Sequence, residues 1–159
     1  FELIPAPTRL YSAAIPSIYQ TIAADPRDVS VLQLPFGVKD GTYETGRFNT
    51  ASQYYQTYHR KRLIGGYLSR ISHHRIKAYH RRPTLFTLLM LSQGREVEPF
   101  RVEAVIRRGR SFVERAKLGY VVIDRAHATP ALVHFATEAF ELEKIAESDG
   151  RELYRTRLQ

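Results

Sequence analysis

Two runs of apolar, largely β-branched residues constrain the fold more than any other feature of this sequence. The first, VSVLQLPF, covers residues 29–36, and the second, YVVID, covers residues 120–124. Neither run alternates polar with apolar positions, which is typical of strands buried on both faces. Such strands need a layer of helices on each face, so the runs predict two adjacent central strands in an α/β fold. The residues expected to be buried there are Val31, Leu32, Leu34, Val121, Val122 and Ile123.

Helical patterns alternate with these strands. Apolar spacing, prolines in first turns and capping residues predict helices near residues 16–24, 50–61, 83–93 and 129–142. A fifth helix is predicted to open at SFVE, where Ser111 and Glu114 have capping-box spacing. Residues 37–49 read as a mobile polar loop, and residues 63–69 as a short strand weakened by two glycines. With a C-terminal antiparallel hairpin around Asp149-Gly150, the pattern predicts a mostly parallel layered sheet with flanking helices.

Length and composition limit the classes of protein to consider. The 159 residues predict one soluble domain, and no run of eighteen apolar residues is present that would cross a membrane. The absence of cysteine excludes disulfides and thiolate metal sites. The sequence begins at Phe1, in FELIPAPTRLYS, without the features of a signal peptide. We therefore expect the domain to be a piece cut from a longer protein.

The distribution of charge points to an anionic partner. The chain has a formal charge of +8, and residues 58–82 contain eight Lys/Arg and four His with no acidic residue. A local positive field of this kind favours anions, although a solvated basic face that binds nothing is the alternative. The candidate anion- or lipid-facing residues are His59, Arg60, Lys61, Arg62, Arg70, Arg75 and Lys77.

A second candidate site is a crevice beyond the second buried strand. Asp124 ends that strand, and ligands of open α/β sheets bind beyond the carboxyl ends of strands. The candidate crevice comprises Gly65, Gly66, Tyr67 and Asp124. For Asp124 itself, the commoner role is to hold the following loop through hydrogen bonds.

The sequence contains no complete catalytic or cofactor motif. The glycines form no phosphate-binding pattern, and Asp124 has no base or second acid at motif spacing. His73, His74 and His80 have no carboxylate or thiolate nearby to complete a zinc site. We therefore predict no catalytic residue, no metal and no cofactor for this part of the chain.

Taken in order, several short segments resemble one bacterial protein family. FELIPAP, VLQLPFG, QYYQTYHRKRLIGGYLSR, GYVVIDR and DGRELYR are similar to the soluble tail of polytopic membrane glycosyltransferase-like proteins related to mannosyl- and arabinosyltransferases. The matching residues include His59, Gly65, Gly66, Tyr67 and Arg70, whereas Arg60 replaces the glycine that is usual after the histidine. The resemblance implies an α/β domain on the extracytoplasmic face of a bacterial membrane.

The resemblance also implies the partners. An accessory domain in that place would contact the membrane surface, the transmembrane part of its own chain, or a lipid-linked sugar or glycan acceptor. The family's catalytic acid lies in a part of the parent protein that this sequence does not include. The alternative from another class is a basic nucleic-acid-binding module, since phosphates pair with Lys and Arg and bases stack on tyrosine rings.

Overall fold

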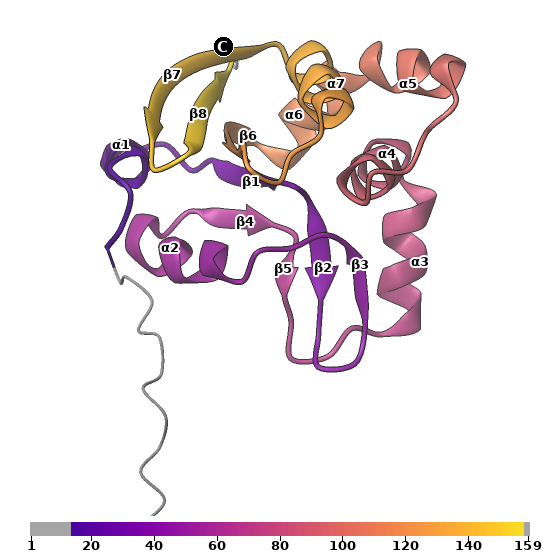
Figure 1. Cartoon of the computed structure of the whole chain (residues 1–159), viewed down its shortest axis with the longest axis horizontal. Helices are drawn as coiled ribbons and strands as arrows, with labels where there is room; N and C mark the ends of the chain where they lie inside the picture. Colours follow the sequence, from indigo (N-terminus) through magenta and orange to yellow (C-terminus); the bar gives the residue numbers. More distant parts are fainter. Residues whose placement is uncertain (1–13, 158–159) are drawn as a thin grey trace, which may run out of the picture.

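The computed structural model describes residues 14–157 as a five-stranded sheet with helices on both sides and a smaller three-stranded sheet beside it (Figure 1). The main sheet has the order β4-β1-β6-β8-β7. Its strands are β1 (Ser30–Leu34), β4 (Arg62–Ile64), β6 (Leu118–Asp124), β7 (Leu142–Ser148) and β8 (Arg151–Thr156). The predicted α/β class is confirmed. The segment FELIPAP lies outside the described residues.

The central strands are buried on both faces, as the two apolar runs predicted. Successive residues of β1 and β6 point to opposite sides, so Leu32 and Val121 belong to one core cluster and Val31 and Val122 to another. All six residues that were expected to be buried there are at most 1% exposed. Strand β1 pairs in parallel with β6, with Val31 opposite Tyr120.

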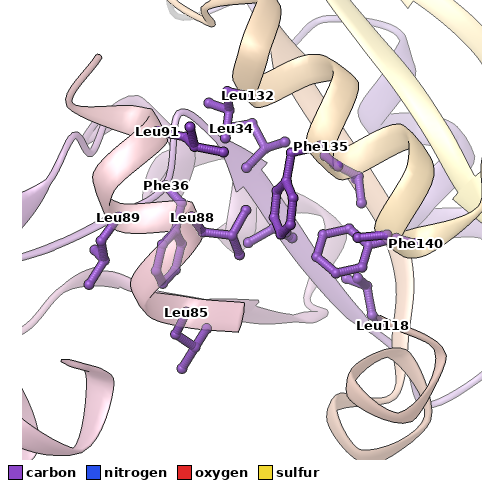
Figure 2. Close-up of a cluster of buried hydrophobic side chains, with 14 of the residues drawn as sticks. Leu34, Phe36, Leu85, Leu88, Leu89, Leu91, Leu118, Leu132, Phe135 and Phe140 are labelled. Carbon is purple, nitrogen blue, oxygen red and sulfur yellow. The ribbon is translucent and has the colours of Figure 1, made fainter. Parts of the chain in front are cut away.

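Each core cluster is closed by its own helices. Helices α1 (Ile18–Ala24) and α2 (Ala51–His59) cover one face of the sheet and lie together at the left of Figure 1. The other face carries α4 (Pro83–Ser92), α5 (Pro99–Ile106), α6 (Gly109–Ala116) and α7 (Pro130–Phe140), at the right of Figure 1. Figure 2 shows leucines of α4 meeting Leu34 and Phe36, with Phe135 and Phe140 of α7 beside them.

The sheet is mixed, which corrects the prediction that it is mostly parallel. Strand β1 pairs in parallel with β4 and β6, but β8 pairs antiparallel with both β6 and β7. The predicted C-terminal antiparallel hairpin is confirmed, and its strands β8 and β7 form one end of the main sheet. The hairpin itself turns at Asp149 and Gly150, both at positive φ, as predicted from this dipeptide.

The smaller sheet differs from two sequence predictions, namely the loop at residues 37–49 and the single strand at residues 63–69. Residues 37–49 hold a hairpin of β2 (Gly37–Lys39) and β3 (Glu44–Gly46), not a loop. The expected strand 63–69 is divided between β4 in the main sheet and β5 (Gly66–Tyr67), which pairs with β2. Gly65 makes the division because its φ of +88° turns the chain from one sheet to the other.

The predicted helices at Pro83 and Thr129 are confirmed, and the Thr129 hydroxyl caps α7 by accepting from Leu132 N. The predicted capping box is wrong, because α6 begins at Gly109 and Ser111 lies inside it. Helices α3 (His73–Arg81) and α5 had no sequence prediction.

Candidate anion-binding groove

Two adjoining cavities lie between edge strand β4 and helices α3, α4 and α6. Their volumes are about 470 Å³ and 560 Å³. They share part of their lining, namely Arg82, Phe112, Arg115 and Ala116, so they form one continuous depression. We refer to the two cavities together as the arginine groove.

Arginine is the only charged residue type that lines this groove. Six of them come from three separate parts of the chain, namely Arg62, Arg75, Arg81, Arg82, Arg108 and Arg115. All six are exposed, and no acidic side chain from the described part of the chain belongs to the lining. Like charges gathered in one depression repel one another. An anion that enters the groove relieves this repulsion, so its binding is electrostatically favourable.

Few contacts neutralise these guanidinium groups. Arg62 approaches Asp28 at 3.5 Å, a contact in which both side chains are more than half exposed. Arg115 donates from Nε to the backbone oxygen of Ser111 at 3.1 Å. Exposed pairs of the first kind contribute little because water screens them. The groove therefore keeps most of its positive charge available for a ligand.

The backbone adds to this positive field. Helix α4 begins at Pro83, and the preceding Arg82 is extended, with φ −93° and ψ 110°. Pro83 and the buried Thr84 both line the groove, so the amino end of α4 opens into it. The dipole of a helix gives its amino end partial positive charge, which attracts anions such as phosphate.

The exposed members of the predicted basic set separate into two groups. Arg62 and Arg75 line the groove, together with Gly65 from the predicted crevice. Arg60, Arg70 and Lys77 are exposed but lie outside the lining.

Two further arginines of the groove had no sequence prediction. Arg108 and Arg115 lie at the start and in the last turn of α6. The only signal that could have indicated them is their spacing of seven residues, which places both on one helix face.

Lys61 is tied into the structure and does not face a ligand. Its Nζ donates to the backbone oxygens of Asp25 and Arg27, at 2.5 Å and 2.6 Å. These bonds connect the end of α2 to the chain that follows α1. The ammonium group is therefore used to satisfy two backbone carbonyl groups, which is a structural role and not a ligand-binding one.

His59 is also excluded from an anion-facing role because it is 2% exposed. Its ring stacks on Tyr19, and its Nδ1 accepts a hydrogen bond from Lys61 N at 3.1 Å. Its Nε2 has no hydrogen-bond partner among residues 14–157. Burial, with the charge of Lys61 as a smaller cause, lowers the pKa of His59 to about 4. A neutral, internal imidazole is a packing residue between α1 and α2.

The predicted crevice residues do not form one site. Gly65 lies in the arginine groove, Gly66 and Tyr67 lie in β5, and Asp124 lies at the end of β6. Asp124 holds the following loop, as its commoner role predicted, because Oδ1 accepts from Ala126 N at 3.1 Å. What the sequence did not indicate is His127, whose Nδ1 lies 3.0 Å from Asp124 Oδ2.

Comparison with protein-family models, with curated proteins and with solved structures gave no significant match for this chain. Within residues 14–157, no helix is both long and apolar enough to cross a bilayer. The same residues contain no cluster of three or more His, Asp or Glu side chains placed to hold a metal ion. The chemistry of the groove itself is therefore the basis for a functional proposal.

Proposed function

We propose that this domain is a non-catalytic anion-binding module whose arginine groove holds phosphate groups at a membrane surface. The observation that carries the proposal is the set of six arginines around one depression whose described lining contains no acidic side chain. Guanidinium groups match phosphate oxygens with two parallel hydrogen bonds each. A basic cluster near an anionic bilayer gains about 1 kcal/mol for each Lys or Arg.

The sequence resemblance supplies the setting of the proposal. There the domain is an accessory part of a bacterial membrane glycosyltransferase-like protein, on the extracytoplasmic face. Its partners are anionic lipid, the transmembrane part of the same chain, and a lipid-linked sugar or glycan acceptor. The groove would hold the domain close to the bilayer while the parent protein acts on its substrates.

An apolar cleft beside the groove favours a lipid surface over other anions. This cavity of about 470 Å³ shares Arg81 and Arg108 with the groove and is lined by Phe86, Val97 and Phe100. Phe100 is 63% exposed. Cations next to an exposed aromatic ring are typical of segments that lie at the boundary between headgroups and acyl chains.

The exposed tyrosines of α2, which favoured a nucleic-acid-binding module, do not lie beside the arginines of the groove. The exposed rings of Tyr54 and Tyr58 belong to α2. That helix covers the opposite face of the main sheet from α4 and α6. A nucleic-acid strand that stacked on these two tyrosines could not at the same time place its phosphates in the arginine groove.

Liposome co-sedimentation tests the proposal. The domain should bind vesicles that contain phosphatidylglycerol and should not bind vesicles of phosphatidylcholine alone. The variant R75Q/R82Q/R115Q removes three groove charges and should lose roughly 3 kcal/mol of binding, or about a hundredfold in affinity.

The matched control is R70Q/R95Q/R155Q, which removes the same charge from exposed positions outside the groove and should bind nearly as the parent does. Two results would contradict the proposal. One is an equal loss of binding in both triple variants, which would mean that net charge alone is responsible. The other is tight, salt-resistant binding to one oligonucleotide sequence, which would establish the nucleic-acid alternative.

A further inference from the structure

A separate polar crevice of about 280 Å³ opens where β1 and β6 end, away from the arginine groove. The two strands are parallel neighbours, so their carboxyl ends meet at one edge of the sheet. After β1 the chain forms the β2–β3 hairpin and then returns to the sheet through α2 on one face, whereas after β6 it continues into α7 on the other face. Ligands of open α/β sheets bind beyond the carboxyl ends of two adjacent strands whose following connections run to opposite faces of the sheet, because a crevice remains between those connections.

Two cations reach this crevice from the β2–β3 hairpin. Lys39 and Arg47 both line it. Lys39 lies 3.1 Å from Glu44, a half-exposed pair. Arg47 is exposed and forms no ion pair within residues 14–157, while its backbone N–H donates to Phe36 O at 2.9 Å. A free guanidinium on an anchored backbone is suited to holding a small oxyanion.

The crevice also contains a histidine held in place by an acid. Asp124 Oδ1 accepts from Ala126 N, and Oδ2 lies 3.0 Å from His127 Nδ1. This arrangement orients the ring and leaves Nε2 available to the crevice that His127 lines. The lone pair of Nε2 in a neutral ring of this tautomer accepts a hydrogen bond, for which a ligand hydroxyl is the natural donor.

The beginning of α2 completes the lining with neutral polar groups. Asn49 Oδ1 accepts from Ala51 N at 3.0 Å, so its amide nitrogen remains as a donor for a ligand. Thr50 lines the crevice and is exposed, so its hydroxyl is accessible to a ligand. The crevice thus combines cationic groups with neutral donors and acceptors, and its one carboxylate, Asp124, already contacts Ala126 N and His127 Nδ1.

We propose that this crevice is a binding site for a small hydroxylated phosphate ester. The phosphate lies against Arg47 and Lys39, and the hydroxyl groups bond to His127, Asn49 and Thr50. The volume suits a ligand with few atoms, since drug-sized molecules need about 300–1,000 Å³. This site does not depend on the arginine groove and adds recognition of a soluble small molecule to the domain.

A ¹H–¹⁵N NMR titration tests the proposal, with glycerol 3-phosphate, inorganic phosphate and glycerol as probes. The ester should shift the amides at residues 47–51 and 124–128, and it should bind more tightly than either inorganic phosphate or glycerol. R47Q should raise the dissociation constant for the ester about tenfold, as the loss of a charge-assisted hydrogen bond implies. H127Q should lower the affinity for the ester to about that for inorganic phosphate.

The matched control is R70Q, which removes one exposed arginine outside the crevice and should leave the titration unchanged. Because Arg47 is exposed, the spectrum of R47Q should otherwise match that of the parent domain. Unchanged ester affinity in R47Q would overturn the site. Shifts confined to amides around Arg82 and Arg115 would overturn it as well, since the ester would then occupy the groove.

Discussion

At the scale of single residues, the fold depends on places where two backbones meet without room for a side chain. Gly109, at the start of α6, lies against the carbonyl group of Ala139 in α7. A Cβ placed on Gly109 would overlap that carbonyl oxygen and come within 2.6 Å of its carbon. Neither atom is the end of a flexible side chain, so relief requires the two helices to separate.

Gly109→Ala should therefore destabilise the domain by roughly 2 kcal/mol, the usual cost of overpacking a core contact. Chemical denaturation followed by circular dichroism measures the change in the free energy of unfolding. Gly41→Ala is the matched control, because the nearest atom to its added Cβ is the Tyr67 hydroxyl at 3.8 Å and Gly41 is exposed. Equal stability of the two variants would show that α6 and α7 pack less closely than described.

His59 should make stability fall as the pH drops below neutral. The unfolded chain binds a proton near the ordinary pKa of 6.5, whereas the folded chain does so only near a pKa of about 4. Between these values the unfolded state holds more protons, so acidification favours unfolding. The expected loss between about pH 7 and pH 5 is roughly 2 kcal/mol.

Denaturation curves at the two pH values measure this loss, and His59→Asn should remove most of it. The amide oxygen of the introduced side chain can accept from Lys61 N as Nδ1 of His59 does, so the variant keeps that contact. Asp40 does not interfere, because backbone N–H groups of Thr42 and Ile71 lower its pKa to about 2 and its contribution is lost only in stronger acid. An unchanged pH dependence in the variant would contradict the assignment.

At the scale of elements, the sequence predicts those that bury an unbroken apolar surface. Strands β1 and β6 and helix α4 have such runs, so their positions followed directly from the sequence. Helix α3 has no buried residue, and the β2–β3 hairpin is largely polar, so neither had a periodic signal. Their structure comes from contacts with distant segments, which local patterns do not contain.

The residues of the candidate sites likewise include some that the sequence predicts and some that it does not. Arg62 and Arg75 belong to a basic segment that the sequence displays directly. Arg108 and Arg115 join them only because α6 and α4 lie on the same face of the sheet and line one cavity. The sequence did not predict His127, because an aspartate at a strand end followed by a histidine three residues later is not a known functional motif. These residues become neighbours through the tertiary fold alone.

Helix α3 should be the least protected helix next to the groove. It contacts the core only through the half-buried Ile76 and Tyr79, whereas α4 buries most of its side chains. Elements with few buried apolar contacts open at low free energy. Hydrogen exchange followed by mass spectrometry should therefore show faster exchange in α3 than in α4.

The cap of α3 gives a matched test of this expectation. Ser72 Oγ accepts from Arg75 N at 3.4 Å. Ser72→Ala should accelerate exchange in α3 further and leave α4 unchanged, because a capping residue contributes about 1 kcal/mol to its own helix. Equal protection of α3 and α4 would contradict the expectation.

At the scale of the whole molecule, the net charge of +8 makes the folded state sensitive to polyanions. Tripolyphosphate at a hundred times its dissociation constant stabilises a folded protein by about 2.7 kcal/mol, if it binds that state alone. For a chain of this size the melting temperature should then rise by roughly 5–10 °C.

Differential scanning fluorimetry measures this rise. The variant R75Q/R82Q/R115Q should lose most of it, because the groove charges are gone, while R47Q should retain it. The same rise in the parent and in both variants would show that tripolyphosphate does not select the groove.

Gly65 links the two parts of the molecule that carry these charges. It lines the arginine groove, and a Cβ placed on it would come within 2.7 Å of both Gly37 O and the Phe36 ring. Gly37 begins the hairpin that carries Lys39 and Arg47 to the other crevice. No side chain fits between Gly65 and Gly37, so a larger residue at position 65 would displace the start of the hairpin and the wall of the groove together.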